Sequence, residues 1–307
     1  MNYTEVEVFC LRKWEPYQDD LRIKHFTENL STFNQQLPDS IDSCTELMLR
    51  RFDYYSHSKV NEGLIELHQK LLKQPNIDLQ YTTFAVLKSQ RERYNSSYEH
   101  VREYKIINNL SDNNITPSVS DWFNRPEWQY LENVVFLDDM CGTGKTFIEY
   151  FKKHIDYLKD KKIYYVIIHI MTEAKTRIEK FAKDNSLNIY ILSYNETAAT
   201  FSMPELKDYR DTFQKECENL GIKKLWDVFG YKYDNSKSTD QLYSESLVSF
   251  YLNTPNNTLG LFRCKTDKLV ALFPRETKEK PAWMTMNERK AQKSRSNYFC
   301  KSRRYSK

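Results

Sequence analysis

Apolar residues in the first 75 positions recur at helical spacing. In the segment 59–73 they fall on one face, with polar residues opposite, which is the pattern of an amphipathic helix. These residues are Val60, Leu64, Leu67 and Leu71. Helices are also predicted over 15–33 and 43–55. We therefore expect residues 1–75 to form a helical N-terminal region that packs on the core of the protein.

The spacing changes after residue 75, where short apolar runs alternate with helical patterns. The predicted strands span residues 80–87, 134–137, 162–170, 187–192 and 247–252. Predicted helices between the three middle runs join them by short links, an arrangement that predicts right-handed crossovers and a parallel sheet. We expect residues 76–275 to form an α/β domain, a mainly parallel sheet flanked by helices. Residues 276–307 are expected to form a basic tail.

One predicted strand ends in two carboxylates and a turn of small residues. The run 134–137 is followed by Asp138 and Asp139, and then by a small-residue loop at 141–144. A helical pattern begins at Lys145. Backbone N–H groups in such a loop can point at a phosphate, and the dipole of the following helix favours negative charge there. The stretch therefore predicts an anion site.

A nucleotide-binding P-loop, G-x-x-x-x-G-K-[ST], is one interpretation of this stretch. Gly144, Lys145 and Thr146 match its end, but Asp139 stands where the first glycine belongs. Its carboxylate would face the phosphates, and no later predicted strand ends in an acid that could serve the magnesium ion. A buried strand followed by an ordinary capped turn, with no ligand, is another interpretation.

The same stretch resembles the phosphoribosyl diphosphate loop of type I phosphoribosyltransferases. That loop has an apolar strand, two adjacent acids, a short loop and then Thr-Gly-x-Thr, which is the order of residues 134–146. Phe136, Cys141 and Gly142 depart from the residue types usual in that family. The resemblance implies that Asp138 and Asp139 bind the ribose hydroxyls and Mg²⁺. It implies a 5′-phosphate site formed by Gly142, Thr143, Gly144, Lys145 and Thr146.

An earlier loop in type I phosphoribosyltransferases grips the diphosphate. The corresponding basic turn after the strand at 80–87 contains Lys88, Ser89 and Arg91. The resemblance implies that these three residues bind the diphosphate, although a solvated charged turn explains the same composition.

A second segment narrows the resemblance. FLDDMCGTGKT, together with TPNNTLGLF and LFPR further along the chain, resembles the phosphoribosyltransferase-like proteins of bacterial conflict and antiphage systems, some of which accompany retrons. The resemblance covers about residues 45–275 and implies that Asn256 and Asn257 line the cleft. Gly260 and Lys268 stand where that family has a tryptophan and a more proline-rich run.

This resemblance implies a phosphoribosyltransferase-like effector that binds a ribose 5-phosphate or diphosphate ligand with Mg²⁺. The ligand would be phosphoribosyl diphosphate or a related nucleotide, and the reaction a phosphoribosyl transfer or a related hydrolysis. A defence-system partner protein is also implied. No residue identifies the acceptor. The alternatives are a P-loop-like NTPase and a non-catalytic nucleic-acid-binding subunit of a defence complex.

The tail is strongly basic, with eight Lys and Arg residues and one acid, Glu288, between positions 287 and 307. Cations can neutralise phosphates, and the interleaved aromatics Tyr298, Phe299 and Tyr305 can stack on bases. The predicted nucleic-acid ligands are Arg289, Lys290, Lys293, Arg295, Arg303 and Arg304. A reverse-transcribed DNA or RNA would suit them, although a disordered solubilising end has the same composition.

Composition adds limits to these interpretations. The chain has 307 residues, 40% of them hydrophobic, and can bury a large core. Its six cysteines are scattered, which indicates reduced thiols and no zinc site. No apolar run approaches the ~18 residues of a membrane span, and no signal-peptide pattern opens the sequence. We expect a cytoplasmic protein that does not enter a membrane.

Overall fold

The computed structural model describes residues 3–15, 20–75, 77–87, 96–116, 118–233 and 243–275. The chain divides into two units, Met1–Arg275 and Glu276–Lys307, and every described residue belongs to the first. The predicted diphosphate ligands Lys88, Ser89 and Arg91 lie outside the described residues. So do the predicted nucleic-acid ligands of the tail: Arg289, Lys290, Lys293, Arg295, Arg303 and Arg304.

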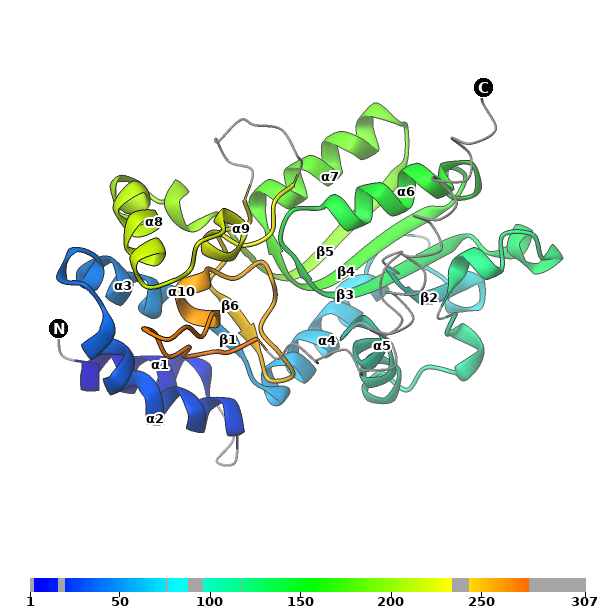
Figure 1. Cartoon of the computed structure of the whole chain (residues 1–307). Helices are drawn as coiled ribbons and strands as arrows, with labels where there is room; N and C mark the ends of the chain where they lie inside the picture. Colours follow the sequence, from blue (N-terminus) through cyan, green and yellow to red (C-terminus); the bar gives the residue numbers. More distant parts are fainter. Residues whose placement is uncertain are drawn as a thin grey trace, which may run out of the picture. The chain divides into compact units, whose positions relative to one another are not determined.

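In the described chain a 4-stranded parallel sheet has the order β2-β3-β4-β5 (Figure 1). Its strands are β2 (Thr82–Val86), β3 (Asn133–Cys141), β4 (Lys162–Met171) and β5 (Asn188–Thr197). In register, Val135 pairs with Tyr164, and Tyr164 pairs with Tyr190. The predicted α/β fold with a mainly parallel sheet is confirmed.

Helices cover both faces of this sheet. One face is covered by α6 (Lys145–Leu158) and α7 (Thr172–Asp184), and the other by α4 (His57–Leu72) and α5 (Ser96–Ile107) (Figure 1). Strand β4 is buried along nearly its whole length, which is why its sequence is a continuous apolar run. Because β3, β4 and β5 run in the same direction, their carboxyl ends meet at one edge, where ligands of such sheets bind.

The N-terminal helices and the last part of the described chain share a second core. Its helices are α1 (Tyr3–Trp14), α2 (Leu21–Gln36), α3 (Asp39–Arg51), α8 (Arg210–Asn219), α9 (Leu225–Val228) and α10 (Gly260–Arg263). The centre is aromatic: Phe273 stacks on Phe26 and Phe52, with ring centroids 5.4 and 4.7 Å apart. This second core is built from residues near both ends of the described chain, between 6 and 54 and between 201 and 273.

The predicted helix over 43–55 is wrong at its C-terminal end. Helix α3 ends at Arg51, and β1 (Asp53–Tyr55) follows, paired in parallel with β6 (Val248–Phe250). Adjacent tyrosines favour a strand, but the partner strand lies near the other end of the described chain. The local sequence pattern therefore could not predict that β1 pairs with β6. Helix α1 was not predicted either.

Short 3₁₀ helices connect the larger elements. They are η1 (Leu79–Tyr81), η2 (Asp112–Asn114), η3 (Val119–Asp121), η4 (Pro126–Tyr130), η5 (Thr200–Ser202) and η6 (Lys207–Tyr209). Within the described ranges, none of the helices has the length and apolar character needed to cross a membrane.

Candidate functional site

Asp138 and Asp139 lie inside β3 rather than after it, because the strand continues to Cys141. Side chains alternate along a strand, so the two carboxylates turn to opposite faces of the sheet. Asp138 Oδ2 accepts a hydrogen bond from the Tyr165 hydroxyl at 2.8 Å, whereas Asp139 Oδ2 lies 3.7 Å from His100 Nε2 of α5. Through Oδ1, each carboxylate also accepts from the backbone N–H of the next residue, at 3.0 and 2.9 Å. Both acids are thus held in defined orientations.

Tyr165 orients Asp138. Its ring is buried beside Phe147 of α6, with the ring centroids 4.6 Å apart. Burial, and after it the Asp138 carboxylate, raises the pKa of Tyr165 well above its usual range, so the hydroxyl stays protonated and donates. Tyr165 was not among the predicted site residues, because in the sequence it is one member of an apolar run.

The turn after β3 leads into α6 and presents backbone N–H groups. Gly144 is the N-cap of α6 and has a φ of 76°, in the left-handed region that glycine tolerates. No backbone carbonyl of the described residues accepts from the N–H groups of Gly142, Thr143, Thr146 or Phe147. Such donors, together with the dipole of a helix of 14 residues, favour an anion at this end.

Two cationic side chains lie at this turn. Arg177 of α7 donates from Nη1 to the Thr143 carbonyl at 3.4 Å, and its guanidinium lies 4.7 Å from the centroid of the Tyr233 ring. Lys145 Nζ lies 3.9 Å from the Glu149 carboxylate, one helical turn along α6. Arg177 was not predicted as a site residue, because the sequence shows it only as part of the polar face of a helix.

The structure brings Asn257 to the same turn. A Cβ added to Gly142 would lie 2.2 Å from both Cγ and Oδ1 of Asn257, so the amide rests directly on the glycine. The Asn257 side chain is half-buried and makes no hydrogen bond to another described residue. Its neighbour Asn256 is exposed. Of the two predicted cleft residues, Asn257 therefore has the closer approach to the turn.

His100 approaches the acid pair from α5. The side chain is only 1% exposed, and Nδ1 lies 3.8 Å from Glu103 Oε2 while Nε2 faces Asp139. Burial lowers the pKa of His100, but the carboxylates of Asp139, Glu103 and Asp138 outweigh it and raise the pKa overall. Glu103 also accepts a hydrogen bond from the Tyr251 hydroxyl at 2.6 Å. His100 was not predicted, because its segment carried no recognisable motif.

Two cavities lie away from the acid pair. One, of about 430 Å³, has only uncharged lining residues, including Thr82 and Trp122, and opens at the amino ends of the strands. The other, of about 340 Å³, lies beside the carboxyl end of β5. Its cations already pair with carboxylates: Lys13 with Asp53, Arg50 with Glu46 and Arg51 with Glu205. We place the candidate site at the acid pair, where acids, helix N–H groups and cations lie together.

The model of the PRTase-CE family matches residues 28–275. The chain belongs to the PRTase-CE family. Among solved structures, it is similar to Helicobacter pylori xanthine-guanine-hypoxanthine phosphoribosyltransferase at 13% identity and a TM-score of 0.30, over 52% of this chain and 97% of that chain. That likeness is too distant to carry an argument. No curated protein matches the sequence.

Membership of the PRTase-CE family confirms the broader part of the sequence resemblance: this is a phosphoribosyltransferase-like protein. The matched range contains the acid pair, the turn 142–146 and both asparagines of the predicted cleft. The ligand, the metal, the nucleic acid and the defence context remain predictions.

A divalent metal would find few protein ligands in this PRTase-CE protein. Among the described residues, no group of three or more His, Cys, Asp or Glu could hold a metal ion. Asp138 and Asp139 are half-buried, and 17% of the Asp139 side-chain surface is exposed. Mg²⁺ at phosphate sites typically takes one or two protein carboxylates and completes its shell with substrate oxygens and water. The acid pair therefore fits a Mg²⁺ that arrives with a phosphorylated ligand.

Proposed function

We propose that the end of β3 binds a ribose 5-phosphate group, carried by phosphoribosyl diphosphate or a related nucleotide, together with Mg²⁺. The observation that carries the proposal is the placement of two adjacent carboxylates near the end of β3, two residues before a turn with available N–H groups at the start of α6. A phosphate needs donors and positive charge, whereas ribose hydroxyls need acceptors. The turn supplies donors for the phosphate, and the acid pair supplies acceptors for the ribose hydroxyls. One ribose 5-phosphate group needs both.

The phosphate half consists of residues 142–146. N–H groups at the start of the helix bind a phosphate oxygen well, because the partial positive charge of the helix end adds to each hydrogen bond. Arg177 and Lys145 add cations beside the turn. The amide of Asn257, resting on Gly142, is placed to donate to a phosphate oxygen or to a ribosyl oxygen.

The ribose half consists of the acid pair. A carboxylate accepts hydrogen bonds from hydroxyl groups, and Asp138 and Asp139 are already oriented by backbone N–H groups and by Tyr165. Pre-oriented acceptors bind better because less side-chain freedom is lost when the ligand arrives. A P-loop NTPase is the weaker candidate, because Asp139 occupies the position of its first glycine.

The reaction proposed for the site is transfer of the phosphoribosyl group, or its hydrolysis. The diphosphate departs with the electron pair of its bond to the ribose and leaves positive charge on the ribose, which carboxylates near the ring would stabilise. Bound Mg²⁺ would neutralise charge on the leaving diphosphate. Burial raises the pKa of the Cys141 thiol to about 12, which disfavours the thiolate that a nucleophile needs. The acceptor could be a base, a protein side chain, a nucleic acid or water.

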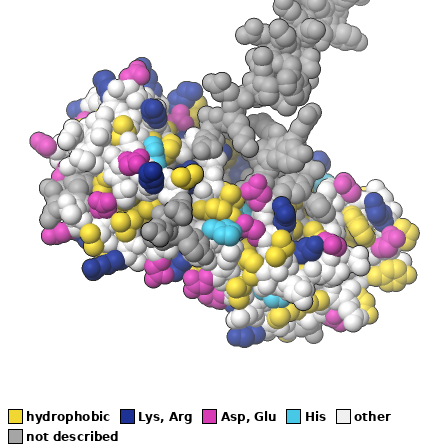
Figure 2. Space-filling model, turned by 90° about the horizontal axis from the view of Figure 1, so that it is seen from below, with side chains coloured by type: hydrophobic (Ala, Val, Ile, Leu, Met, Phe, Trp, Pro, Cys, Tyr) yellow, Lys and Arg dark blue, Asp and Glu magenta, His cyan; other side chains and the backbone are white. Residues whose placement is uncertain are grey.

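The proposed setting is an antiphage, retron-type defence system in the cytoplasm, with a partner protein and a nucleic acid. The support is the sequence resemblance, and the basic residues of 287–307 would supply the nucleic-acid contacts. The face seen from below in Figure 2 mixes acidic, basic and apolar side chains over its described surface. That mixture favours the tail over this face as the source of phosphate contacts.

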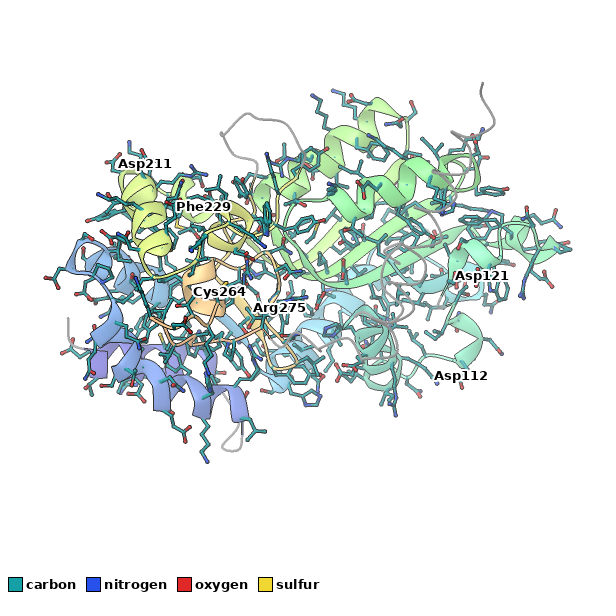
Figure 3. All side chains as sticks on the ribbon, in the orientation of Figure 1. Asp112, Asp121, Asp211, Phe229, Cys264 and Arg275 are labelled. Atoms are coloured by element: carbon teal, nitrogen blue, oxygen red, sulfur yellow. The ribbon has the colours of Figure 1, made fainter. Side chains whose placement is uncertain are left out.

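Calorimetry with phosphoribosyl diphosphate and Mg²⁺ tests the proposal. We expect the wild type to bind this ligand more tightly than ATP, and the Asp138→Asn/Asp139→Asn double variant to lose at least tenfold in affinity. Asp211→Asn is the matched control, because it removes an exposed carboxylate of α8 (Figure 3). Equal affinity of the double variant and the control would refute the site, and a preference for ATP would favour the NTPase.

A further inference from the structure

His100 lies between two carboxylates at the edge of the candidate site. Its ring is 1% exposed, with Nε2 3.7 Å from Asp139 Oδ2 and Nδ1 3.8 Å from Glu103 Oε2. Asp139 belongs to β3 and Glu103 to α5, so the ring spans the interface between helix and sheet. His100 therefore links α5 to the acid pair through its two ring nitrogens.

The polar atoms of this cluster lack partners at hydrogen-bond distance. Neither ring nitrogen of His100, nor Glu103 Oε2, has such a partner in the described chain. Buried polar atoms without partners are destabilising and rare. Both separations exceed an ordinary N–H···O distance of about 2.9 Å by less than about 1 Å. A small movement of Asp139 would bring its carboxylate into hydrogen-bond contact with the ring.

Glu103 holds the far side of the ring in place. Its Oε1 accepts a hydrogen bond from the Tyr251 hydroxyl at 2.6 Å and lies 3.3 Å from His57 Nε2. Glu103 is therefore fixed from two directions, and His100 has a rigid neighbour behind it. Asp139 Oδ1 accepts a hydrogen bond from the Met140 N–H at 2.9 Å, and Oδ2 is the oxygen that faces the His100 ring.

We propose that His100 is a positioning residue that holds Oδ2 of Asp139 in the orientation needed to accept a ribosyl hydroxyl, with Glu103 bracing the ring. The inference rests on the proposed function of the acid pair. With Oδ1 held by the backbone and Oδ2 held by His100, the remaining lone pairs of Asp139 point in fixed directions. The ligand then meets a preorganised acceptor, as effective sites require.

A double-mutant cycle tests whether His100 acts through Asp139. The proteins are the wild type, His100→Leu, Asp139→Asn and the double variant, and the measurement is the dissociation constant for phosphoribosyl diphosphate with Mg²⁺. A hydrogen bond to a charged group corresponds to about tenfold or more in affinity. We expect about that loss from His100→Leu in the wild type and less than about twofold when Asp139 is already Asn.

Three further measurements separate positioning from a general structural effect. His100→Gln, which keeps an N–H donor, should recover most of the affinity. The affinity for inorganic phosphate, which binds the turn without reaching Asp139, should not change in His100→Leu. His25→Leu alters a half-buried histidine of α2 that takes no part in the acid pair or its bracing and should bind phosphoribosyl diphosphate as the wild type does.

The outcomes distinguish this inference from the function on which it rests. The positioning role is refuted if the wild type binds phosphoribosyl diphosphate and His100→Leu lowers the affinity by the same factor in the wild type and in the Asp139→Asn variant. If the wild type does not bind phosphoribosyl diphosphate, the proposed function fails. The contact between His100 and Asp139 is then tested by measuring the urea unfolding of the same four proteins. Coupling of about tenfold in the unfolding constant would support it, and additive effects would overturn it.

Discussion

Gly142 has no room for a side chain, and this makes the contact between the turn and Asn257 testable. A Cβ on Gly142 would lie 2.2 Å from Cγ and Oδ1 of Asn257 and 2.8 Å from its Cβ. The φ of Gly142 lies outside the left-handed region, so alanine meets a steric obstacle and no backbone strain. We predict that Gly142→Ala destabilises the protein, and that Asn257→Ala in the same chain relieves part of the loss.

The expected magnitude follows from these contacts. Overpacking typically costs about 1–3 kcal/mol, and the lower half of that range applies because the half-buried amide of Asn257 can swing aside. Asn257→Ala alone should change the free energy of unfolding by less than about 0.5 kcal/mol, because the amide has no hydrogen bond to lose within the described chain. The double variant removes the 2.2 Å overlaps and keeps the contact at 2.8 Å. A coupling of about 1 kcal/mol is expected.

Urea unfolding of the four proteins of this cycle measures the coupling. The matched control pairs Gly142→Ala with Asn256→Ala, which alters the exposed neighbour on the same turn, and should be additive. Additive losses for Gly142→Ala and Asn257→Ala, or no loss from Gly142→Ala, would show that Asn257 does not rest on the turn. The role of Asn257 in binding the ligand would then lose its structural support.

Other regions give further predictions. Arg210→Met should destabilise the fold by about 3–5 kcal/mol, because the buried Glu245 carboxylate loses the guanidinium 3.0 Å away. Burial raises the pKa of Glu245 and the Arg210 guanidinium opposes that rise, so loss of Arg210 raises the folded-state pKa further and disfavours the ionised carboxylate more strongly in the variant. Urea unfolding should therefore show a larger loss at about pH 7 than at about pH 4, and a pH-independent loss would contradict this. Asp139→Gly should weaken binding of phosphoribosyl diphosphate in calorimetry, whereas tighter binding of ATP would favour a P-loop. Truncation after Pro281 should lower affinity for single-stranded nucleic acid at low salt and flatten its salt dependence, and equal binding would contradict a role for the tail.

The sheet and the turn could be predicted because their signals are local. Strand β4 is an unbroken apolar run since both of its faces are covered, and the acid pair, glycines and helix start follow one another within residues 134–146. Each of these features depends on neighbours in the sequence. Periodicity and motif spacing record such neighbours directly.

Contacts between distant segments could not be predicted in this way. Tyr165, Arg177 and His100 reach the acid pair or the turn from three different elements, and each is an unremarkable member of its own segment. The pairing of β1 with β6 joins segments from nearly opposite ends of the described chain. Asn257 was predicted only through its resemblance to a family segment, since nothing in its local sequence indicates that it rests on Gly142.

A crystal structure with ribose 5-phosphate and Mg²⁺ would test the central claim most directly. The account predicts a phosphate within hydrogen-bond distance of the N–H groups of residues 142–147, and ribose hydroxyls on Asp138 and Asp139. Density for the ligand in the uncharged cavity beside Thr82 and Trp122, with the turn after β3 empty, would contradict it.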